Sequence, residues 1–371
     1  LFDRTNILMT RMNFHQELIV AIATMAAGFL SMFGSGSIIY NIIRNKKYTR
    51  DTYHRLLLGA CITDFVSSVG WFMAPLAPPQ ESSPRVLPIG NVASCSTQAY
   101  FIQVGVGFMV YNACLSIYYV LTIRYNVTEK MMSRREIYMH GISLLWGFGI
   151  SIIPIPLEIY NELGVGTGCW LGRFPQYCDA IDSIVPCARG ASVDPSIVGY
   201  IIGGFPSIMS LIIVIVCNRL VYNSVKKNSE TTRRFSIGND RLQKRTEAIA
   251  SQATWYVLVF LNSMFWQLLL RILDGLDVIT DDNESVFTPL IVLAAFFSGF
   301  SGFGFLLVYI RPRYIRYRSR KVSHFASVMA ALSFRKPKGL PPRCRASSNY
   351  ASSDGIPNDI PNELQAGGNL N

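Results

Sequence analysis

The chain has 371 residues, of which 50% are hydrophobic and only 15% are charged, whereas soluble domains carry about 25% charged residues. This deficit argues against a soluble domain and favours a membrane protein. The net charge of +11 could indicate a nucleic-acid-binding protein, but the cations lie in the gaps between apolar stretches rather than on one basic surface. We therefore expect membrane lipids around the chain and no nucleic acid as a partner.

Seven apolar stretches follow one another along the chain, and each is long enough to cross a membrane core of about 30 Å as a helix. They are residues 18–43, 54–77, 97–123, 138–160, 197–222, 246–272 and 285–310. The pattern predicts an all-α integral membrane protein, a bundle of seven transmembrane helices over residues 18–310. Prolines inside or at the ends of these stretches predict bends: Pro75, Pro154, Pro156, Pro206 and Pro289.

The gaps between the stretches differ in charge. Lys and Arg number 26 in segments 44–53, 124–137, 223–245 and 311–371 taken together. They number 5 in segments 1–17, 78–96, 161–196 and 273–284. By the positive-inside rule, the first group is cytoplasmic and the second group, with the N-terminal segment, is extracellular.

Two regions follow the seventh stretch. Cations and apolar residues alternate at near-helical spacing over residues 311–334, so we expect a basic amphipathic helix lying on an anionic inner membrane surface. Residues 335–371 are rich in Pro, Gly, Ser, Asn and Asp and hold too little apolar material to fold alone, which predicts a disordered cytoplasmic tail. Cys344 in this tail could be acylated or could be an idle thiol.

Two polar residues inside the spans, Asp64 and Asn112, would be costly if they faced lipid. Asp64 is a carboxylate deep in the second span, and Asn112 lies in the third, which also carries Gln103. We expect Asp64 and Asn112 to form an intramembrane polar site, in which a paired Asp64 marks a water or ion site that changes between two states of the bundle. The alternative is a satisfied structural carboxyl without a role in switching.

Four of the eight cysteines lie in predicted outer segments: Cys95, Cys169, Cys178 and Cys187. Only these four would face an oxidising compartment. A bond from Cys95 to Cys169 would draw the second outer segment across the mouth of the bundle, and Cys178 could then close a smaller ring with Cys187. Spacing alone allows three pairings, and this is the one we expect.

The combination of features resembles a G protein-coupled receptor. Seven spans with an outer N-terminus, the Cys169-Trp170 pair after Cys95, and a last span that runs through VYIRPRY into a basic helix carry the resemblance. It is closest to protist receptors grouped with the slime-mould cyclic-AMP receptors and the secretin-like class, and it covers about residues 15–325. Within it, residues 58–64 are similar to the small-residue run that ends in an aspartate, and 308–314 match the end of the seventh span.

The resemblance implies a multi-pass plasma-membrane receptor, with its N-terminus outside and its C-terminus in the cytoplasm, that couples an extracellular ligand to a heterotrimeric G protein. A basic cleft at the inner ends of the third, fifth and sixth spans would contact the G protein. The candidate residues are Arg124, Tyr125, Lys226, Arg241, Lys244 and Arg245. Ile123 stands where rhodopsin-like receptors carry an acid. Arg124 therefore lacks the neighbouring acid that restrains the arginine in the inactive state of those receptors. Its alternative role is an anchor to lipid phosphates.

The extracellular ligand is unknown, and the outer segment 1–17 is short, so we expect binding between the helices. Four residues could line a polar mouth there: Gln103, Trp170, Gln267 and Arg271. Arg271 could instead snorkel to the interface or pair with Asp274. Two arginines precede Ser236, which makes it a candidate phosphorylation site, although a plain solvated charge run fits the same segment.

A small-solute transporter or channel is the alternative function. Residues 285–310 contain no lysine, so a retinal Schiff base at the position usual in opsins is excluded. No HExxH, GxSxG, Walker or CxxC motif occurs, and the four histidines have no metal-ligand spacing. We therefore expect no enzyme activity, no metal and no cofactor.

Overall fold

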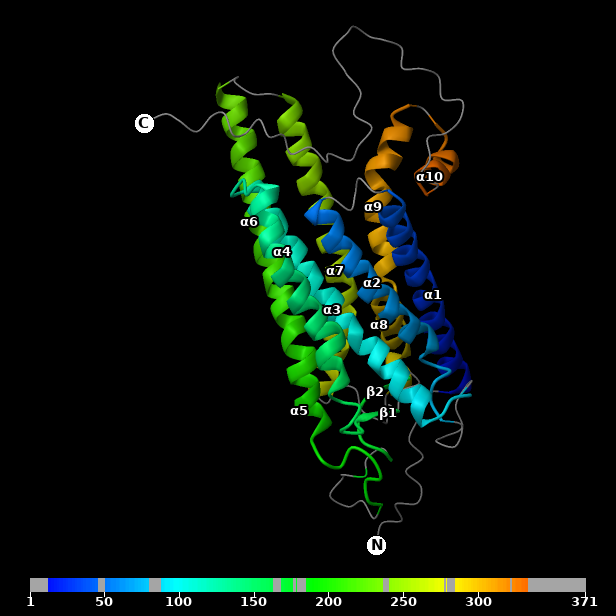
Figure 1. Cartoon of the computed structure of the whole chain (residues 1–371). Coiled ribbons are helices and arrows are strands. Elements are labelled where there is room, and N and C mark those ends of the chain that lie inside the picture. The colour runs from blue at the N-terminus through cyan, green and yellow to red at the C-terminus, as the bar shows by residue number, and fades with distance from the viewer. Residues whose placement is uncertain are drawn as a thin grey trace.

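The computed structural model describes residues 13–45, 51–79, 88–162, 168–175, 178, 185–235, 240–276, 278, 284–320 and 322–332. Between residues 228 and 247 it describes the backbone alone. Long helices lie side by side along one direction and form a bundle (Figure 1). The predicted tail 335–371, Cys344, Ser236 and most of the predicted outer segment 1–17 lie outside the described residues.

The elements follow in chain order. The helices and strands of the first half are α1 Phe14–Arg44, α2 Thr52–Met73, α3 Val92–Ile123, α4 Glu129–Leu144, the π-helix η4 Leu145–Gly149, the 3-10 helix η5 Ile150–Ile152, and strands β1 Tyr160–Glu162 and β2 Cys169–Leu171. Those of the second half are α5 Pro195–Gly199, the π-helix η6 Tyr200–Gly204, α6 Phe205–Phe235, α7 Asp240–Gly275, the 3-10 helix η7 Glu284–Phe287, α8 Thr288–Gly299, α9 Ser301–Arg318 and α10 His324–Leu332.

The helices agree with the predicted spans. Among the described residues, α1, α2, α3, the run from α5 into α6, and α7 are each long and apolar enough to cross a membrane, and the bent pair α8 and α9 makes a sixth span. The remaining predicted span is built from α4, η4 and η5 in succession. The all-α membrane fold of seven spans is therefore confirmed.

Two spans are interrupted for different reasons. Pro206 lies at the start of α6, directly after the π-turn η6. A proline has no amide hydrogen and its ring clashes with the carbonyl four residues earlier, and the wider turn accommodates it. The seventh span bends by 55° between α8 and α9, at Phe300 and not at Pro289, which occupies the first turn of α8, where proline is tolerated.

Helix α3 is the centre of the bundle. In its most apolar stretch 78% of the residues are buried, against 50% or less in the other four helices that span alone. Close approach to the fourth span depends on glycine, because a Cβ added at Gly107 would lie 2.8 Å from the Cα of Gly147. The span predicted at residues 97–123 therefore lies at the centre of the bundle.

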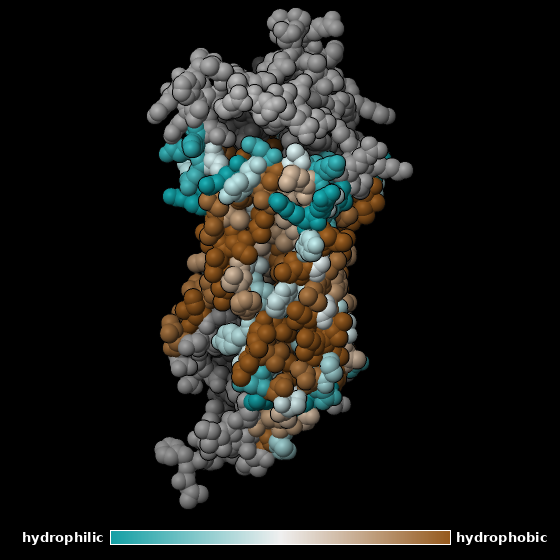
Figure 2. Space-filling view, turned by 60° about the vertical axis from the view of Figure 1, so that its left-hand side comes forward, coloured by the Kyte–Doolittle hydropathy of each residue, from teal (hydrophilic) through white to brown (hydrophobic). Residues whose placement is uncertain are grey.

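The outside of the bundle is apolar over the length of the helices. Large side chains on α6 that point away from the core, such as Ile212, Ile215 and Val216, are about half exposed. Figure 2 shows a hydrophobic band on one face of the molecule, with hydrophilic residues above and below it. Such a band matches the hydrocarbon core of a bilayer between two polar interfaces.

The region predicted as one juxtamembrane helix, 311–334, is divided in the structure. Helix α9 continues past Ile310 without a break as far as Arg318 and contains Pro312, and α10 follows as a separate helix. The two lie at the end of the bundle opposite the strands β1 and β2 (Figure 1).

Helix α10 is amphipathic, as the sequence predicts. Its His324 lies with Nδ1 2.8 Å from the Tyr314 hydroxyl of α9, and Ala331 is fully buried against the bundle. Phe325 and Met329 are exposed on the other side. An exposed apolar face beside arginines is typical of a helix that lies in a membrane interface.

Candidate functional site

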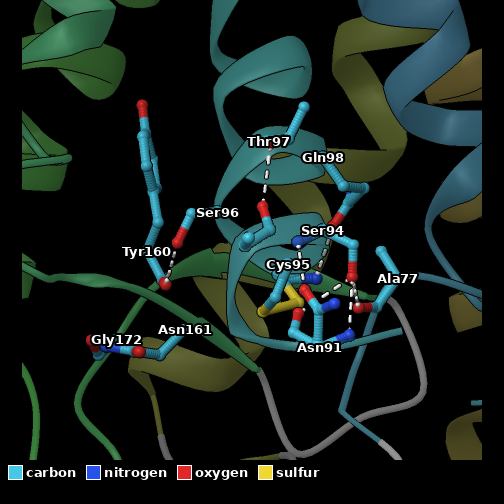
Figure 3. The surroundings of a disulfide bond; sticks show 12 residues. Ala77, Asn91, Ser94, Cys95, Ser96, Thr97, Gln98, Tyr160, Asn161 and Gly172 are labelled. Carbon is cyan, nitrogen blue, oxygen red and sulfur yellow. Dashed lines mark hydrogen bonds between the residues drawn. A yellow bond between two sulfur atoms is a disulfide. The ribbon is translucent and has the colours of Figure 1, made fainter. Parts of the chain in front are cut away.

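A disulfide bond joins Cys95 in α3 to Cys169 in β2. The start of α3 beside it is capped by the Asn91 side chain, which accepts a hydrogen bond from the Ser94 amide at 2.9 Å. The Ser94 hydroxyl donates to the Ala77 carbonyl at 2.8 Å and thereby ties this cap to the end of the second span (Figure 3). The cap explains why α3 begins before residue 97, since an asparagine side chain satisfies an amide at the helix start.

The strand that carries Cys169 is also bound to α3 by two glutamines. The Cys169 amide donates to Gln98 Oε1 at 2.8 Å, and Trp170 Nε1 donates to Gln103 Oε1 at 2.9 Å. Gln103 in turn donates through Nε2 to the Ile202 carbonyl of η6 at 3.2 Å. The structure therefore brings together Gln103 and Trp170, two of the four predicted mouth residues, and adds Gln98, which the sequence reading missed.

The other two predicted mouth residues are placed differently. Gln267 donates from Nε2 to the Ser298 hydroxyl at 2.6 Å and so links α7 to α8. Arg271 belongs to the last turns of α7, and its side chain is outside the described part of the structure. Gln267 thus has a hydrogen-bond partner in a neighbouring helix, which sequence spacing could not indicate.

A second disulfide bond joins Cys178 to Cys187 within the same outer segment, so both expected pairings are present. Arg189, two residues further on, donates from Nε to Asn161 Oδ1 at 2.9 Å. Asn161 donates to the Gly172 carbonyl at 2.9 Å. These bonds fasten the segment after Cys187 to the hairpin of β1 and β2.

Asp64 is buried at the point where three spans meet. Its Oδ2 accepts hydrogen bonds from Ser31, at 3.2 Å, and from Ser35, both in α1. Its Oδ1 accepts a hydrogen bond at 2.5 Å from Ser301, which is the first residue of α9. The Gly302 amide donates to the Ser31 hydroxyl at 2.8 Å, so the same cluster also satisfies the backbone at the bend of the seventh span.

Asn112, the other predicted intramembrane residue, lies apart from this cluster. It donates from Nδ2 to the Phe108 carbonyl one turn earlier, at 2.9 Å. It also lines a small cavity of about 10 Å³ with Ser116, Tyr119 and Tyr256, room for about one water molecule. The structure shows no hydrogen bond between Asn112 and Asp64 among those it describes, so the two form separate polar sites.

The partners of Asp64 had a signal in the sequence. Ser31 and Ser35 are four residues apart and share one face of the first span. Small hydroxyl residues on one face of a span are typical of a helix that packs on a polar neighbour. Ser301 had no comparable signal, because its position depends on the bend at Phe300.

At the end of the bundle opposite the hairpin of β1 and β2, Arg124 follows the last residue of α3 and is exposed. Its guanidinium carbon lies 5.7 Å from the centre of the Tyr125 ring. Lys226 near the end of the fifth span is exposed as well. The backbone of α7 includes positions 241, 244 and 245, but the structure does not describe the side chains of Arg241, Lys244 and Arg245.

An ion pair at this end was missed from the sequence. Arg55 in α2 donates from both Nε and Nη2 to the Glu136 carboxylate in α4, each at 2.5 Å. Thr52 donates to the same carboxylate at 3.2 Å. Burial by itself raises the pKa of Glu136, but the hydrogen bonds and the charge of Arg55 outweigh it, so the pKa lies below its usual value. Opposite charges at the adjacent ends of the second and fourth spans were the available signal.

Tyrosines from three spans gather between α2, α3 and α7. The Tyr53 hydroxyl of α2 donates to the Tyr256 hydroxyl of α7 at 3.5 Å. The Tyr53 ring centre lies 5.9 Å from that of Tyr119 in α3, and Tyr256 packs on Phe305 of α9 at 4.9 Å. We refer to these four residues as the inner aromatic cluster, which links α2, α3, α7 and α9.

A seven-span bundle with an outer hairpin bonded to its third helix defines a G protein-coupled-receptor-like fold. No protein-family model matches the chain, and no curated protein matches it. Solved structures do match it, among them the crystal structure of squid rhodopsin, with a TM-score of 0.55 at 16% sequence identity. That match covers 89% of this chain and 94% of the rhodopsin chain. The likeness shows the fold, and the cyclic-AMP-receptor-like grouping stays a prediction.

Proposed function

We propose that the protein is a plasma-membrane receptor that passes an extracellular signal to a heterotrimeric G protein. The observation that carries the proposal is the Asp64 cluster at the bend of the seventh span. A carboxylate inside a membrane is costly and is usually functional, and here it connects α1 and α2 to the first residue of α9. Loss of the bond to Ser301 would free the inner half of the seventh span to move, which provides the second packing that a switch needs.

The outer hairpin is the proposed entrance for the ligand. Gln98, Gln103 and Trp170 place amide and indole groups at the mouth of the bundle, and the disulfide bond from Cys95 fixes the hairpin above it. The position of Arg271 near the same end supports a ligand that carries negative charge. The chemical identity of that ligand is not part of the proposal.

The inner end is the proposed contact for the G protein. Arg124 and Lys226 are exposed there, and Tyr125, Arg241, Lys244 and Arg245 complete the predicted basic surface. The inner aromatic cluster holds α7 against α2 and α3, so displacement of α7 would open the cleft between them. Phosphorylation at Ser236 would place negative charge beside this surface and weaken the contact.

The orientation follows from the distribution of cations, and it can be tested directly. An epitope tag inserted at position 185 is expected to stain on intact cells, and a tag at the C-terminus only after permeabilisation. The opposite pattern would contradict both the orientation and the receptor function.

The function is tested with the purified full-length chain in liposomes. We expect it to accelerate the exchange of GDP for a labelled GTP analogue on an added heterotrimeric G protein, and Asp64→Asn to raise basal exchange several-fold because it weakens the bond to Ser301. Solute flux across the same liposomes without any G protein, together with no exchange on a panel of G proteins, would support the alternative transporter or channel.

A further inference from the structure

A groove of about 540 Å³ lies between α7, α9 and α10. Its walls are formed by Leu258 and Val259 of α7 and by Leu307 and Val308 of α9, and Val328 of α10 closes one end. Leu258 and Leu307 are each 48% exposed, so the groove opens to the outside of the bundle. A volume of this size is within the range of about 300–1,000 Å³ that holds small molecules.

One cation marks the end of the groove near α10. Arg311 lines it, with its guanidinium carbon 5.2 Å from the centre of the Trp255 ring. Its Nη1 donates to the Ser251 hydroxyl at 3.2 Å. No carboxylate within the described part of the chain pairs with Arg311. The positive charge is therefore held in place by neutral groups and is free to bind an anion.

The groove has the depth of one membrane leaflet. Ser301 and Arg311 both line it, and ten residues of helix between them correspond to about 15 Å, half of a hydrocarbon core of about 30 Å. Phe297 and Phe300 of the seventh span form the deep end. An apolar channel of this depth with a cation at the membrane surface has the shape and charge of a phospholipid.

We propose that this groove binds one anionic phospholipid of the cytoplasmic leaflet, with the phosphate on Arg311 and one acyl chain between α7 and α9. The proposal rests on the proposed function only for the choice of leaflet, since the orientation places α10 on the cytoplasmic side. A neutral sterol would fill the apolar part but would leave the charge of Arg311 without a partner.

The bound lipid would act on the bend of the seventh span. Ser301 lines the groove and also donates to Asp64. An acyl chain that fills the space beside Phe300 and Ser301 supports α9 in the packing seen here and opposes movement of α7 toward the lipid. The site would thus stabilise one of the two packings of the receptor.

Native mass spectrometry of the purified full-length chain tests the proposal, with dioleoyl phosphatidylserine and dioleoyl phosphatidylcholine as probes. We expect one phosphatidylserine to bind at least about tenfold more tightly than phosphatidylcholine, because the choline cation offsets the phosphate charge of phosphatidylcholine, whereas phosphatidylserine keeps a net negative charge for Arg311 to bind. Arg311→Gln should remove this preference. Arg316→Gln is the matched control, because Arg316 is an exposed arginine on the same helix outside the groove.

A second pair of variants keeps the charge of Arg311 and tests the volume of the groove. Leu307→Trp fills the groove and should weaken phosphatidylserine binding about tenfold, whereas Leu293→Trp alters an exposed position of α8 outside the groove and should not. Equal phosphatidylserine binding by the wild type and Arg311→Gln would overturn the proposal. Cholesterol binding that Leu307→Trp abolishes while phosphatidylserine binding persists would assign the groove to a sterol and also overturn it. No G protein is present, so failure here leaves the proposed signalling untouched.

Discussion

Two arginines at the end of the bundle opposite the hairpin differ in their partners, and we expect their contributions to stability to differ accordingly. The side chain of Arg55 is 29% exposed and forms two hydrogen bonds with Glu136, whose side chain is 10% exposed. Arg124 is exposed and rests on Tyr125. A buried ion pair is costly to break, and a charge on the surface contributes little to stability. Stability and signalling should therefore respond to different residues.

Glu136→Gln is expected to lower the free energy of unfolding by about 2 kcal/mol at neutral pH, because it leaves Arg55 without its charged partner. The folded-state pKa of Glu136 is lowered from the usual value of 4.5, so its contribution is present above pH 4.5 and is lost as pH falls through the folded-state value. Thermal unfolding of the detergent-solubilised wild type and Glu136→Gln should show that their difference in stability disappears as the pH falls below the folded-state pKa of Glu136.

Glu129→Gln is the control for this prediction. Its carboxylate lies 3.9 Å from Arg55 and its side chain is 41% exposed, so we expect a smaller loss of stability at neutral pH. A loss equal to that of Glu136→Gln would show that general charge at this end of the bundle, and not the bidentate pair, is responsible.

Arg124→Ala is expected to leave folding and ligand affinity near normal and to abolish most G protein activation. The reason is its exposure at the end of α3, with no acid at position 123. Nucleotide exchange normalised to the number of receptors at the cell surface measures the effect. Lowered expression with normal exchange per receptor would instead indicate an anchor to lipid phosphates.

At the scale of the element, the seventh span is the part whose shape the sequence did not reveal. The length and polarity of its residues predicted a single helix with a bend near Pro289, and the bend lies at Phe300. Its cause is tertiary, because Ser301 donates to Asp64 and the Gly302 amide donates to Ser31. Local patterns cannot report a bend that depends on two other helices. By contrast, the seven spans follow from apolar length alone.

Gly302→Ala is expected to prevent normal packing of the seventh span. A Cβ at this position would collide with Ser35 and Asp64 and would lie 2.7 Å from the Ser31 carbonyl oxygen. Overpacking of this kind typically costs about 1–3 kcal/mol. We expect a clear drop in melting temperature and in surface expression.

Gly141→Ala is the matched control for Gly302→Ala. A Cβ at Gly141 meets no atom within 4 Å, and alanine is a better helix former than glycine by about 1 kcal/mol. The melting temperature should stay the same or rise slightly. If both variants lowered it equally, steric contact at Gly302 would not be the cause.

At the scale of the whole molecule, the sequence predicted the seven spans and both disulfide bonds, because each depends on composition or on compartment. The orientation of the bundle in the membrane stays a prediction. The residues of the sites were found only in part. Gln103 and Trp170 were predicted to lie together, while Gln98 and the Arg55–Glu136 pair were not. Their roles depend on the rotation of each helix about its axis, which a run of apolar residues leaves undefined.

The two disulfide bonds should differ in their effect on the whole protein. The sequence separation is 74 for Cys95–Cys169 and 9 for Cys178–Cys187, so in the chain-entropy view their loss costs about 4 and about 3 kcal/mol, respectively. Only the first also attaches the hairpin to α3. The double serine variant at Cys95 and Cys169 should therefore show the larger loss of surface expression and of ligand binding.

The corresponding double serine variant at Cys178 and Cys187 should retain more of both properties. Radioligand or label-free binding, scaled to surface receptor number, separates the two effects once a ligand is in hand. Equal losses from the two variants would mean that attachment of the hairpin to α3 has no special importance.

In the proposed receptor, the hydrogen bond between Trp170 and Gln103 would also affect the rates at which a ligand binds and leaves. A ligand that entered between the helices on the side of the hairpin and bound at Gln103 would have to displace the indole, both to enter and to leave. Association would then be slowed, as it is where binding requires a conformational change, and dissociation would be slowed with it. The hairpin would thus lengthen the residence time of a bound agonist without a matching gain in equilibrium affinity, so that each binding event supports a longer signal.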